Sequence, residues 1–321
     1  MRIGLFWLFI LPIMTQACGP VEREPIVADE TASVSEDDFV GRWDVTVQAD
    51  GYTYPSWFEI TRENGGITGR FVGRVGSARP IETIEITESE LYFSLPPQYE
   101  KYDDNLSFRG KLENGVIRGT TISEEKTEVS WTAVRAPDLR VEGMPEWGEP
   151  IQLIQPNLEG WKPRDPDMPN NWVVENGVLR NTERGTDLIT EQEFKDFKLS
   201  LEFRYPEKSN SGVYLRGRYE LQIQDDFGKE PGSLFIGGIY GFLDPVVNAA
   251  RKAGEWQTYE ITLVGRTVTV VLNGTTVIDQ QEIPGITGGA LDSNEGEPGP
   301  LMLQGDHGPV SFRNIVLTPA L

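Results

Sequence analysis

The sequence predicts an all-β protein of two domains, a small antiparallel barrel followed by a jelly-roll sandwich. Three observations support this prediction. Short runs that alternate apolar and polar side chains occur throughout, whereas long apolar runs at the helical period are scarce. The 34 glycines and 22 prolines can form many turns between strands. The length of 321 residues is enough for two domains of ordinary size.

The first 17 residues have the pattern of an export signal. Arg2 precedes an apolar run, 3–14, that is too short to span a bilayer comfortably, and Cys18, the only cysteine, follows soon after. This order resembles a bacterial lipoprotein signal, which implies cleavage before Cys18, a lipid anchor on that residue and an exported protein at the periplasmic or cell-surface side of a membrane. Thr15 departs from the leucine usual at its place, and ordinary signal cleavage after Ala17 is the alternative.

Acidic residues dominate the chain, whose formal net charge is −21. Such a chain repels phosphate backbones and anionic membrane surfaces, so no nucleic acid partner is expected. The segment 18–37 is acidic and has no apolar period, and we expect it to be a disordered tether.

Residues 38–136 have the pattern of successive short strands. Asn-Gly pairs at 64–65 and 114–115 suit tight hairpins because both positions tolerate positive φ. Consecutive hairpins of this length usually close into a small barrel. Gly41-Arg42-Trp43 at the start and Arg135 near the end resemble the Gly-x-Trp and arginine closure of lipocalin-like barrels. A barrel of this kind can hold a ligand, although a filled core is commoner.

A proline-containing segment, 137–150, has no strand pattern and is the expected linker. The second domain, 151–321, again consists of alternating strands. In 199–204, for example, Leu, Leu and Phe alternate with Ser, Glu and Arg, so that one face can pack against a second sheet. A two-sheet jelly-roll sandwich fits this pattern best.

One strand of the second domain carries an unusually polar face. In RYELQIQD, Arg218, Glu220, Gln222 and Gln224 share one parity and therefore one face of the strand. The face is either a solvated sheet surface or the floor of a binding site. We favour the site, because so many planar hydrogen-bonding groups follow one another.

Several segments of 151–321 resemble the 3-keto-disaccharide hydrolase family. The most specific are NSGVYLRGRYELQIQD (210–225) and PGPLMLQGDHGPVSFRNI (298–315). Near Leu153 the family usually has an Asn-Gly turn, which is replaced here by Gln155-Pro156-Asn157. The resemblance implies a concanavalin A-like lectin/glucanase sandwich. It also implies action on glycosides already oxidised to a ketone at carbon 3, by proteins that are often exported lipoproteins.

A 3-keto group changes the chemistry that cleavage requires. The ketone acidifies the proton on C2, so that one general base can form an enolate, which hydrogen-bond donors or cations must stabilise. The aglycone then leaves from C1, and addition of water makes the net reaction a hydrolysis. Glu220 is the candidate base, with Arg216 or Arg218 as the electrophile. His307 in the GDHG loop is the only histidine, and whether it or Glu220 is the base stays open.

Ordinary glycoside hydrolysis uses two carboxylates that flank the bond. In laminarinase-type sandwiches these lie on one strand at i, i+2 and i+4, which corresponds here to Glu220, Gln222 and Gln224. Two of the three are amides, so the sequence disfavours that mechanism.

The remaining candidate residues would bind the sugar. Trp256 and Tyr240 could stack on it, although aromatic residues in strands more often belong to the core. The full predicted set of substrate-binding residues is Asn210, Tyr214, Arg218, Gln222, Gln304, Asp306, Trp256 and Tyr240.

No cofactor is expected to be required. One histidine and one N-terminal cysteine exclude the usual zinc sites, and no metal ligands are assigned. An oxygen-rich site for Ca²⁺ or Mn²⁺ remains an alternative, with candidate ligands Glu220, Asp225, Asp226, Asp306 and His307.

The expected function is therefore cleavage of 3-keto-glycosides on the concave face of the sandwich. The alternative is a surface lipoprotein that binds carbohydrate without catalysis. The expected partners are an oligosaccharide or glycoside substrate and, in another protein, the sugar 3-dehydrogenase that must make the ketone, since no dinucleotide-binding motif is visible here.

Overall fold

The computed structural model describes residues 34–321, which form one compact unit. The predicted signal peptide, Cys18 and the tether as far as residue 33 lie outside the described residues. The end of the predicted tether is not disordered: Glu36–Phe39 forms a 3-10 helix, η1, and Arg62 pairs with Glu36 and Asp37 at N–O distances of 2.7 Å. Within residues 34–321, no helix has the length and apolar character needed to cross a bilayer.

The first domain is a single antiparallel sheet of nine strands. Hairpins connect most sequence neighbours, and β1 also pairs with β9, the last strand of the domain. In spatial order the strands are β4 (Arg79–Pro80), β3 (Gly66–Val72), β2 (Tyr52–Glu63), β1 (Gly41–Ala49), β9 (Glu128–Arg135), β8 (Val116–Ile122), β7 (Leu106–Glu113), β6 (Glu90–Leu95) and β5 (Thr83–Thr87).

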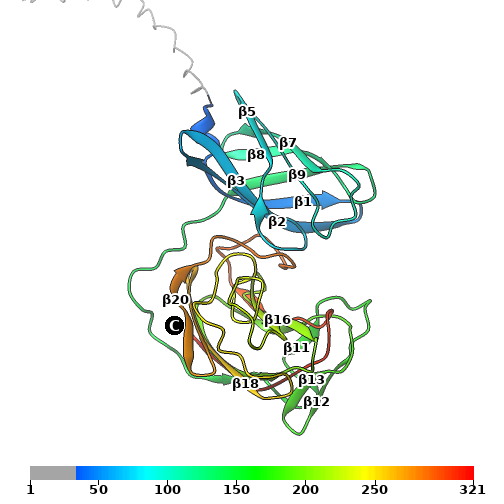
Figure 1. Ribbon diagram of the computed structural model, residues 1–321, viewed down its shortest axis with the longest axis vertical. Coiled ribbons are helices and arrows are strands. Elements are labelled where there is room, and N and C mark those ends of the chain that lie inside the picture. Colours follow the sequence, from blue (N-terminus) through cyan, green and yellow to red (C-terminus); the bar gives the residue numbers. More distant parts are fainter. Residues whose placement is uncertain (1–33) are drawn as a thin grey trace, which may run out of the picture. The chain divides into compact units, whose positions relative to one another are not determined.

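This sheet curls strongly but forms a half-barrel rather than a closed barrel (Figure 1). Its two edges come close to each other, since a Cβ added at Gly69 in β3 would lie 3.0 Å from the side chain of Ile84 in β5. No ladder joins these two edges in the part of the chain that the structure describes. Hydrogen bonds from the two residues between β4 and β5 nevertheless reach both sides of the sheet: the Ile81 amide donates to the Gly69 carbonyl of β3 over 2.9 Å, and the Glu82 amide donates to the Ser94 carbonyl of β6 over 3.0 Å. The lipocalin-like expectation therefore holds for the curvature, and the segment 79–87 links the two edges in place of a ladder between them.

The predicted arginine closure is present. The guanidinium carbon of Arg135 lies 4.1 Å from the ring centroid of Trp43, and its nitrogens donate to the carbonyls of Asp38 and Val40. Aromatic rings fill the interior, with Phe93 stacked on Phe108 at a centroid distance of 4.7 Å. The half-barrel thus has a packed core, as is common for small barrels.

The linker runs along the sandwich. Trp147 forms an isolated β-bridge with Ala320, and the ammonium group of Lys198 lies 4.6 Å from the Trp147 ring centroid. The backbone of Gly148 donates to Pro319 over 2.8 Å. These contacts hold the segment against the second domain.

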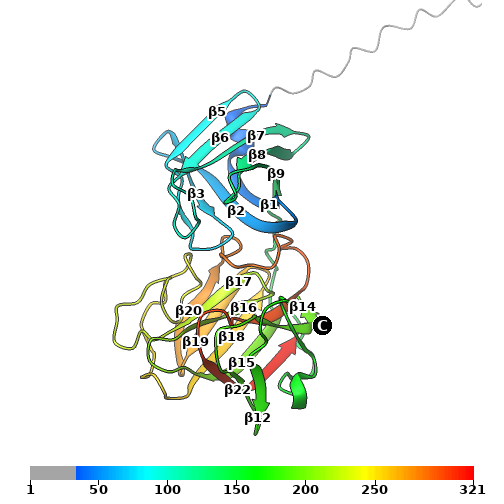
Figure 2. The same ribbon diagram turned by 90° about the vertical axis from the view of Figure 1, so that its right-hand side faces the viewer.

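The second domain is a sandwich of two antiparallel sheets, as predicted. The larger sheet has the order β12 (Trp172–Glu175), β13 (Val178–Asn181), β22 (Val310–Pro319), β15 (Phe197–Arg204), β18 (Gln257–Val264), β19 (Thr267–Leu272) and β20 (Thr275–Glu282), with β10 (Ile151–Gln152) also paired to β22. The smaller has the order β11 (Trp161–Pro163), β14 (Leu188–Phe194), β21 (Gly299–Leu303), β16 (Asn210–Leu215) and β17 (Tyr219–Gln224). A 3-10 turn, η2 (Pro156–Leu158), precedes β11. Figure 2 shows β16 and β17 beside each other.

The alternation of each strand decides what this sandwich buries. Leu199, Leu201 and Phe203 of β15 enter the core, while Ser200 and the residues of the same parity point away from it. Trp57 and Val72 of the half-barrel belong to the same apolar cluster as the sandwich core. The two domains therefore share buried apolar surface.

Candidate functional site

The polar strand lies in a hairpin whose two faces differ in character. Strands β16 and β17 pair so that Tyr214 faces Glu220 and Gly212 faces Gln222. Their other residues, such as Leu221 and the side chains of equal parity, are buried in the core. Tyr214, Glu220 and Gln222 are therefore on the face away from the core, where they line a cleft. The middle of the polar face, Glu220 and Gln222, is therefore the floor of a cleft and not a solvated surface, whereas Arg218 and Gln224 lie outside the cleft lining.

The cleft has a volume of about 800 Å³ and its walls come from both domains. The sandwich contributes the face of its smaller sheet and the loops around it, including 287–291 between β20 and β21. The half-barrel contributes the start of β2 and two loops. Polar and charged residues of the sandwich that line the cleft are Arg164, Asp165, Thr186, Asp187, Asn210, Tyr214, Glu220, Gln222, Tyr240, Gln304, Asp306 and His307.

Glu220 is the most deeply placed acid of this wall, with 3% of its surface exposed. Burial raises its pKa to about 8, although the hydrogen bond from the Tyr214 hydroxyl opposes that shift. This hydroxyl lies 2.9 Å from Glu220 Oε2 and 3.0 Å from the carbonyl oxygen of Gly288. A carboxyl group with a pKa near neutrality can gain or lose a proton during a reaction.

Glycines make room for this arrangement. A Cβ at Gly212 would lie 2.5 Å from Glu220 Oε1, and one at Gly289 would lie 2.5 Å from the Tyr214 hydroxyl. Gly289 also has a φ of 80°, in the left-handed region that favours glycine. Larger residues at these positions would displace the Glu220–Tyr214 pair.

His307 and Asp306 lie at the opening of the cleft, in the loop between β21 and β22. His307 Nδ1 contacts a carboxylate oxygen of Asp306, and 45% of the histidine side chain is exposed. The hydrogen bond with Asp306 raises the pKa of His307, and the nearby Glu220 acts in the same direction. The histidine therefore favours its protonated form, which can donate a proton.

Three amide side chains of the predicted set line the cleft with unused acceptors. Asn210 Oδ1, Gln222 Oε1 and Gln304 Oε1 have no hydrogen-bond partner within residues 34–321. An orphaned buried acceptor costs free energy, about 1–3 kcal/mol, unless a ligand or water satisfies it. Such acceptors suit the hydroxyl donors of a sugar.

The structure adds Arg164 and Asp187, which the sequence reasoning missed. Arg164 directly follows β11 and Asp187 directly precedes β14, and these strands pair. Arg164 Nη1 lies 3.1 Å from Asp187 Oδ2 and donates to the Gly289 carbonyl over 2.9 Å. The Gly305 amide donates to Asp187 Oδ1 over 2.9 Å, while burial raises the pKa of Asp187. The local sequence pattern gives no signal for this pair, because the contact depends on the pairing of β11 with β14.

Arg216, a candidate electrophile from the sequence, lies outside the cleft lining. Strand β16 ends at Leu215, and Arg216 has a φ of 53° in the turn, so strand parity no longer applies. Its guanidinium is buried away from the cleft-lining residues, where NH2 lies 2.8 Å from the Gly265 carbonyl and 3.0 Å from the Tyr219 hydroxyl.

Arg218 and Trp256 are also outside the cleft lining. Arg218 precedes β17 and binds Asp292 Oδ1 at 2.7 Å and the Glu297 carbonyl at 2.8 Å. Trp256 has the guanidinium groups of Arg204 and Arg313 over its ring, at 4.8 and 4.1 Å from the centroid. Their predicted contact with substrate is therefore not supported by their positions. Tyr240, in contrast, lines the cleft.

The five candidate cation ligands do not come together. The Lys208 amide donates to Asp225 Oδ2, and Asp226 pairs with Lys229 at 2.6 Å. Neither aspartate lines the cleft that contains Glu220. Within residues 34–321, no group of three or more His, Cys, Asp or Glu side chains has a geometry suited to a metal ion.

Comparison with known families assigns the sandwich domain. Residues 151–318 match the model of the 3-keto-alpha-glucoside-1,2-lyase-like domain. The chain belongs to this family. The match covers the whole sandwich and leaves out the half-barrel, although the lyase-like domain shares its cleft with half-barrel residues.

Solved structures include similar proteins. A proposed glycosyl hydrolase from Parabacteroides distasonis is 28% identical over 57% of this chain and 93% of its own, with a TM-score of 0.46. A second one from the same organism is 27% identical over 54% and 100%, with a TM-score of 0.43. The β-glucanase of Bacillus licheniformis is 12% identical over 56% and 100%, with a TM-score of 0.37. No curated protein matches the chain.

Proposed function

We propose that this protein cleaves glycosides that carry a ketone at carbon 3, by elimination followed by hydration. The observation that carries the proposal is Glu220: a buried carboxyl group at the floor of the cleft, with a pKa of about 8 and amide neighbours. Removal of the acidified C2 proton needs a single general base whose pKa is near neutrality. The family match to a 3-keto-α-glucoside lyase-like domain supports the same substrate class.

The proposed reaction has three stages: proton abstraction, elimination and hydration. Ionised Glu220 takes the C2 proton, and the C–H electron pair forms a C2–C3 double bond with negative charge on the ketone oxygen. When the ketone re-forms, a C1–C2 double bond forms and the C1–O bond breaks, so that the aglycone leaves with that electron pair. The aglycone oxygen gains a proton. Water then adds its hydroxyl to C1 and a proton to C2, which completes a hydrolysis.

The cleft supplies groups for the two other tasks. Protonated His307 is the candidate acid for the leaving oxygen, because Asp306 favours its charged form. Arg164 replaces Arg216 and Arg218 as the candidate electrophile for the enolate oxygen, since it is a cation lining the same cleft.

Neighbouring acids are less suited to be the base. Asp187 receives hydrogen bonds on both carboxylate oxygens, from Gly305 and Arg164, and Asp306 is engaged with His307. Within residues 34–321, Glu220 accepts a side-chain hydrogen bond only on Oε2. Its other oxygen is available for the substrate proton.

Incubation with a 3-keto-glucoside that bears a chromogenic aglycone, beside its unoxidised parent, tests the proposal. We expect release from the ketone alone, and a loss of at least 100-fold in kcat for Glu220→Gln while the ligand still binds. Binding of both glycosides without release from either would favour the carbohydrate-binding alternative. Release from the parent would indicate ordinary two-carboxylate hydrolysis.

The proposal includes the expected export signal. A lipid on Cys18 would hold the enzyme at a membrane, and a sugar 3-dehydrogenase in another protein would supply the oxidised substrate. Palmitate labelling of the full chain should be abolished by Cys18→Ala. An unchanged label in that variant would place the lipid elsewhere.

A further inference from the structure

The half-barrel brings an aromatic wall to the cleft. Tyr52, Tyr54 and Tyr99 line it together with Arg74, all outside residues 151–318 of the lyase-like domain. Tyr52 is 41% exposed and Tyr99 is 65% exposed, although both are large and partly apolar. Exposed aromatic side chains that gather at a cleft are typical of a binding surface.

Backbone contacts join the loop that contains Arg74 to the sandwich. The Gly289 amide donates to the Arg74 carbonyl over 2.9 Å. A Cβ at Gly288 would lie 2.1 Å from the Gly76 carbonyl oxygen, so the two loops pack backbone against backbone. Gly289 is also the residue that makes room for the Tyr214 hydroxyl. The loop that contacts Tyr214 beside Glu220 therefore also binds the half-barrel loop that contains Arg74.

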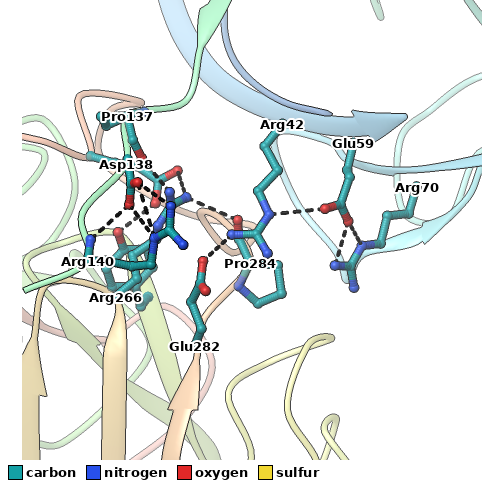
Figure 3. Close-up of polar contacts among 11 residues, drawn as sticks. Arg42, Glu59, Arg70, Pro137, Asp138, Arg140, Arg266, Glu282 and Pro284 are labelled. Carbon is teal, nitrogen blue, oxygen red and sulfur yellow. Dashed lines mark hydrogen bonds and ion pairs between the residues drawn. The ribbon is translucent and has the colours of Figure 1, made fainter. Parts of the chain in front are cut away.

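Polar and aromatic contacts away from the cleft support the same interface. Arg42 of β1 forms an ion pair with Glu282 of β20 and a second one with Glu59 of β2, and Arg266 donates to the Pro137 carbonyl (Figure 3). Trp57 packs edge-on against Phe242, with ring centroids 5.3 Å apart. A wall held in this way needs little ordering when a ligand binds, which favours affinity.

The chemistry of the wall suits a ring with a flat apolar face. The rings of Tyr52 and Tyr54 are 6.1 Å apart and inclined by 34°, and the Arg74 guanidinium lies 5.9 Å from the Tyr52 centroid. Glu124 lies 3.6 Å from Arg74 and balances its charge, so the wall has no free cation aimed at an anionic ligand. Tyrosine offers a large apolar surface with a polar tip, which matches a ring that has hydroxyl groups at its edge.

The position of the wall decides which part of the substrate it meets. Because the oxidised ring must lie over Glu220, the part of the substrate that reaches the half-barrel wall is the leaving group. A cleft of about 800 Å³ lies within the range of about 300–1,000 Å³ that holds drug-sized ligands, and so has room for a second ring.

We propose that Tyr52, Tyr54 and Tyr99 form the leaving-group subsite and select glycosides whose aglycone is a flat-faced ring, either an aryl group or a second pyranose. This inference rests on the proposed function for the position of the oxidised ring. It assigns the half-barrel a role in substrate choice, outside the matched family domain.

The test measures binding in the Glu220→Gln protein, in which turnover should be slow enough to leave the ligand intact. Dissociation constants are determined by calorimetry for the methyl, phenyl and glucosyl glycosides of 3-keto-glucose. We expect both ring-bearing ligands to bind more tightly than the methyl glycoside. Tyr52→Ala and Tyr99→Ala should each reduce that preference by about 3- to 10-fold, as expected for one aromatic contact. A loss confined to the phenyl ligand would identify the aryl group as the occupant, and a loss confined to the glucosyl ligand would identify the sugar.

Tyr92→Ala is the matched control. Tyr92 lies in β6 of the same half-barrel with the Arg109 guanidinium 4.5 Å from its centroid, but does not line this cleft. The ring preference should survive that change. An unchanged preference in both Tyr52→Ala and Tyr99→Ala, or failure of all three ligands to bind, overturns the subsite. Turnover of the methyl 3-keto-glucoside by the unsubstituted protein, which has no ring to stack, reports separately on the proposed function.

Discussion

At the scale of single residues, the Tyr214 hydroxyl controls the proton on Glu220. It lies within hydrogen-bond distance of Glu220 and of the Gly288 carbonyl, but it has one proton to donate. When Glu220 is neutral, its carboxyl O–H can donate a hydrogen bond to the Tyr214 oxygen, and the Tyr214 hydroxyl can donate to the Gly288 carbonyl. When Glu220 is ionised, the hydrogen bond from Tyr214 stabilises its charge, which opposes the upward shift of its pKa by burial.

This pair predicts the pH dependence of the reaction. The base must be ionised and His307 must keep the proton that it donates. We therefore expect kcat/KM to rise about tenfold per pH unit to a midpoint near pH 8 as Glu220 ionises, and to fall once His307 loses its proton. Tyr214→Phe removes a hydrogen bond that favours the ionised form, so the midpoint should move to higher pH. A pH–rate profile of both proteins checks this. A midpoint that moves to lower pH would show that Tyr214 does not stabilise the carboxylate.

At the scale of the element, the hairpin β16–β17 holds the base because one of its residues has no side chain. Gly212 faces Gln222 in the ladder, and Glu220 folds over it, with Oε1 2.5 Å from the place of a Cβ. The backbone of Gly212 has no positive φ, so alanine is compatible with the strand. The glycine is therefore required for space at the site and not for the strand itself.

Gly212→Ala should consequently impair catalysis more than folding. Displacement of Glu220 should lower kcat by about 10- to 100-fold, since small misplacements of catalytic groups are costly. Gly66→Ala, whose Cβ would meet only the Glu63 carbonyl oxygen at 3.7 Å, is the control and should have full activity. Steady-state rates and melting temperatures of both variants decide the matter. Normal kcat in Gly212→Ala would show that Glu220 need not occupy its present position.

At the scale of the molecule, a buried acid pair joins the two domains. Asp44 of the half-barrel and Glu295 of the sandwich are both almost fully buried, and Asp44 Oδ1 has no partner within residues 34–321. Burial raises the pKa of Asp44, and the negative charge of Glu295 raises it further. Glu295 itself binds the Tyr219 hydroxyl at 2.6 Å and Arg266 at 3.4 Å. The folded protein thus favours a protonated Asp44.

The pair predicts how stability depends on pH. The unfolded chain releases the Asp44 proton above its ordinary pKa of 3.8, whereas the folded chain keeps it. Stability should therefore fall as pH rises from about 4 toward the raised pKa of the folded state. Asp44→Asn removes this titration, so it should be more stable than the parent at pH 8 and show a weaker pH dependence. Urea unfolding at pH 5 and 8 measures both. Identical slopes in the two proteins would mean that Asp44 is ionised in the fold.

Much of the fold follows from local pattern. Alternation in β15 and β17 predicts which side chains are buried, because successive residues of a strand point to opposite faces whatever surrounds them. The same rule predicts that Glu220 and Gln222 share one face, and both line the cleft. Strand parity does not extend to Arg216, because a turn with positive φ ends the strand one residue earlier and redirects the side chain.

The sequence by itself thus determined an all-β chain with its strands, the packing of Arg135 on Trp43, the polar floor and the family. The tertiary structure decided the rest of the site. Arg164 meets Asp187 through the pairing of β11 with β14, and Tyr52 and Tyr99 reach the cleft from another domain. Local periodicity contains no information about such encounters, because they depend on which distant segments fold side by side.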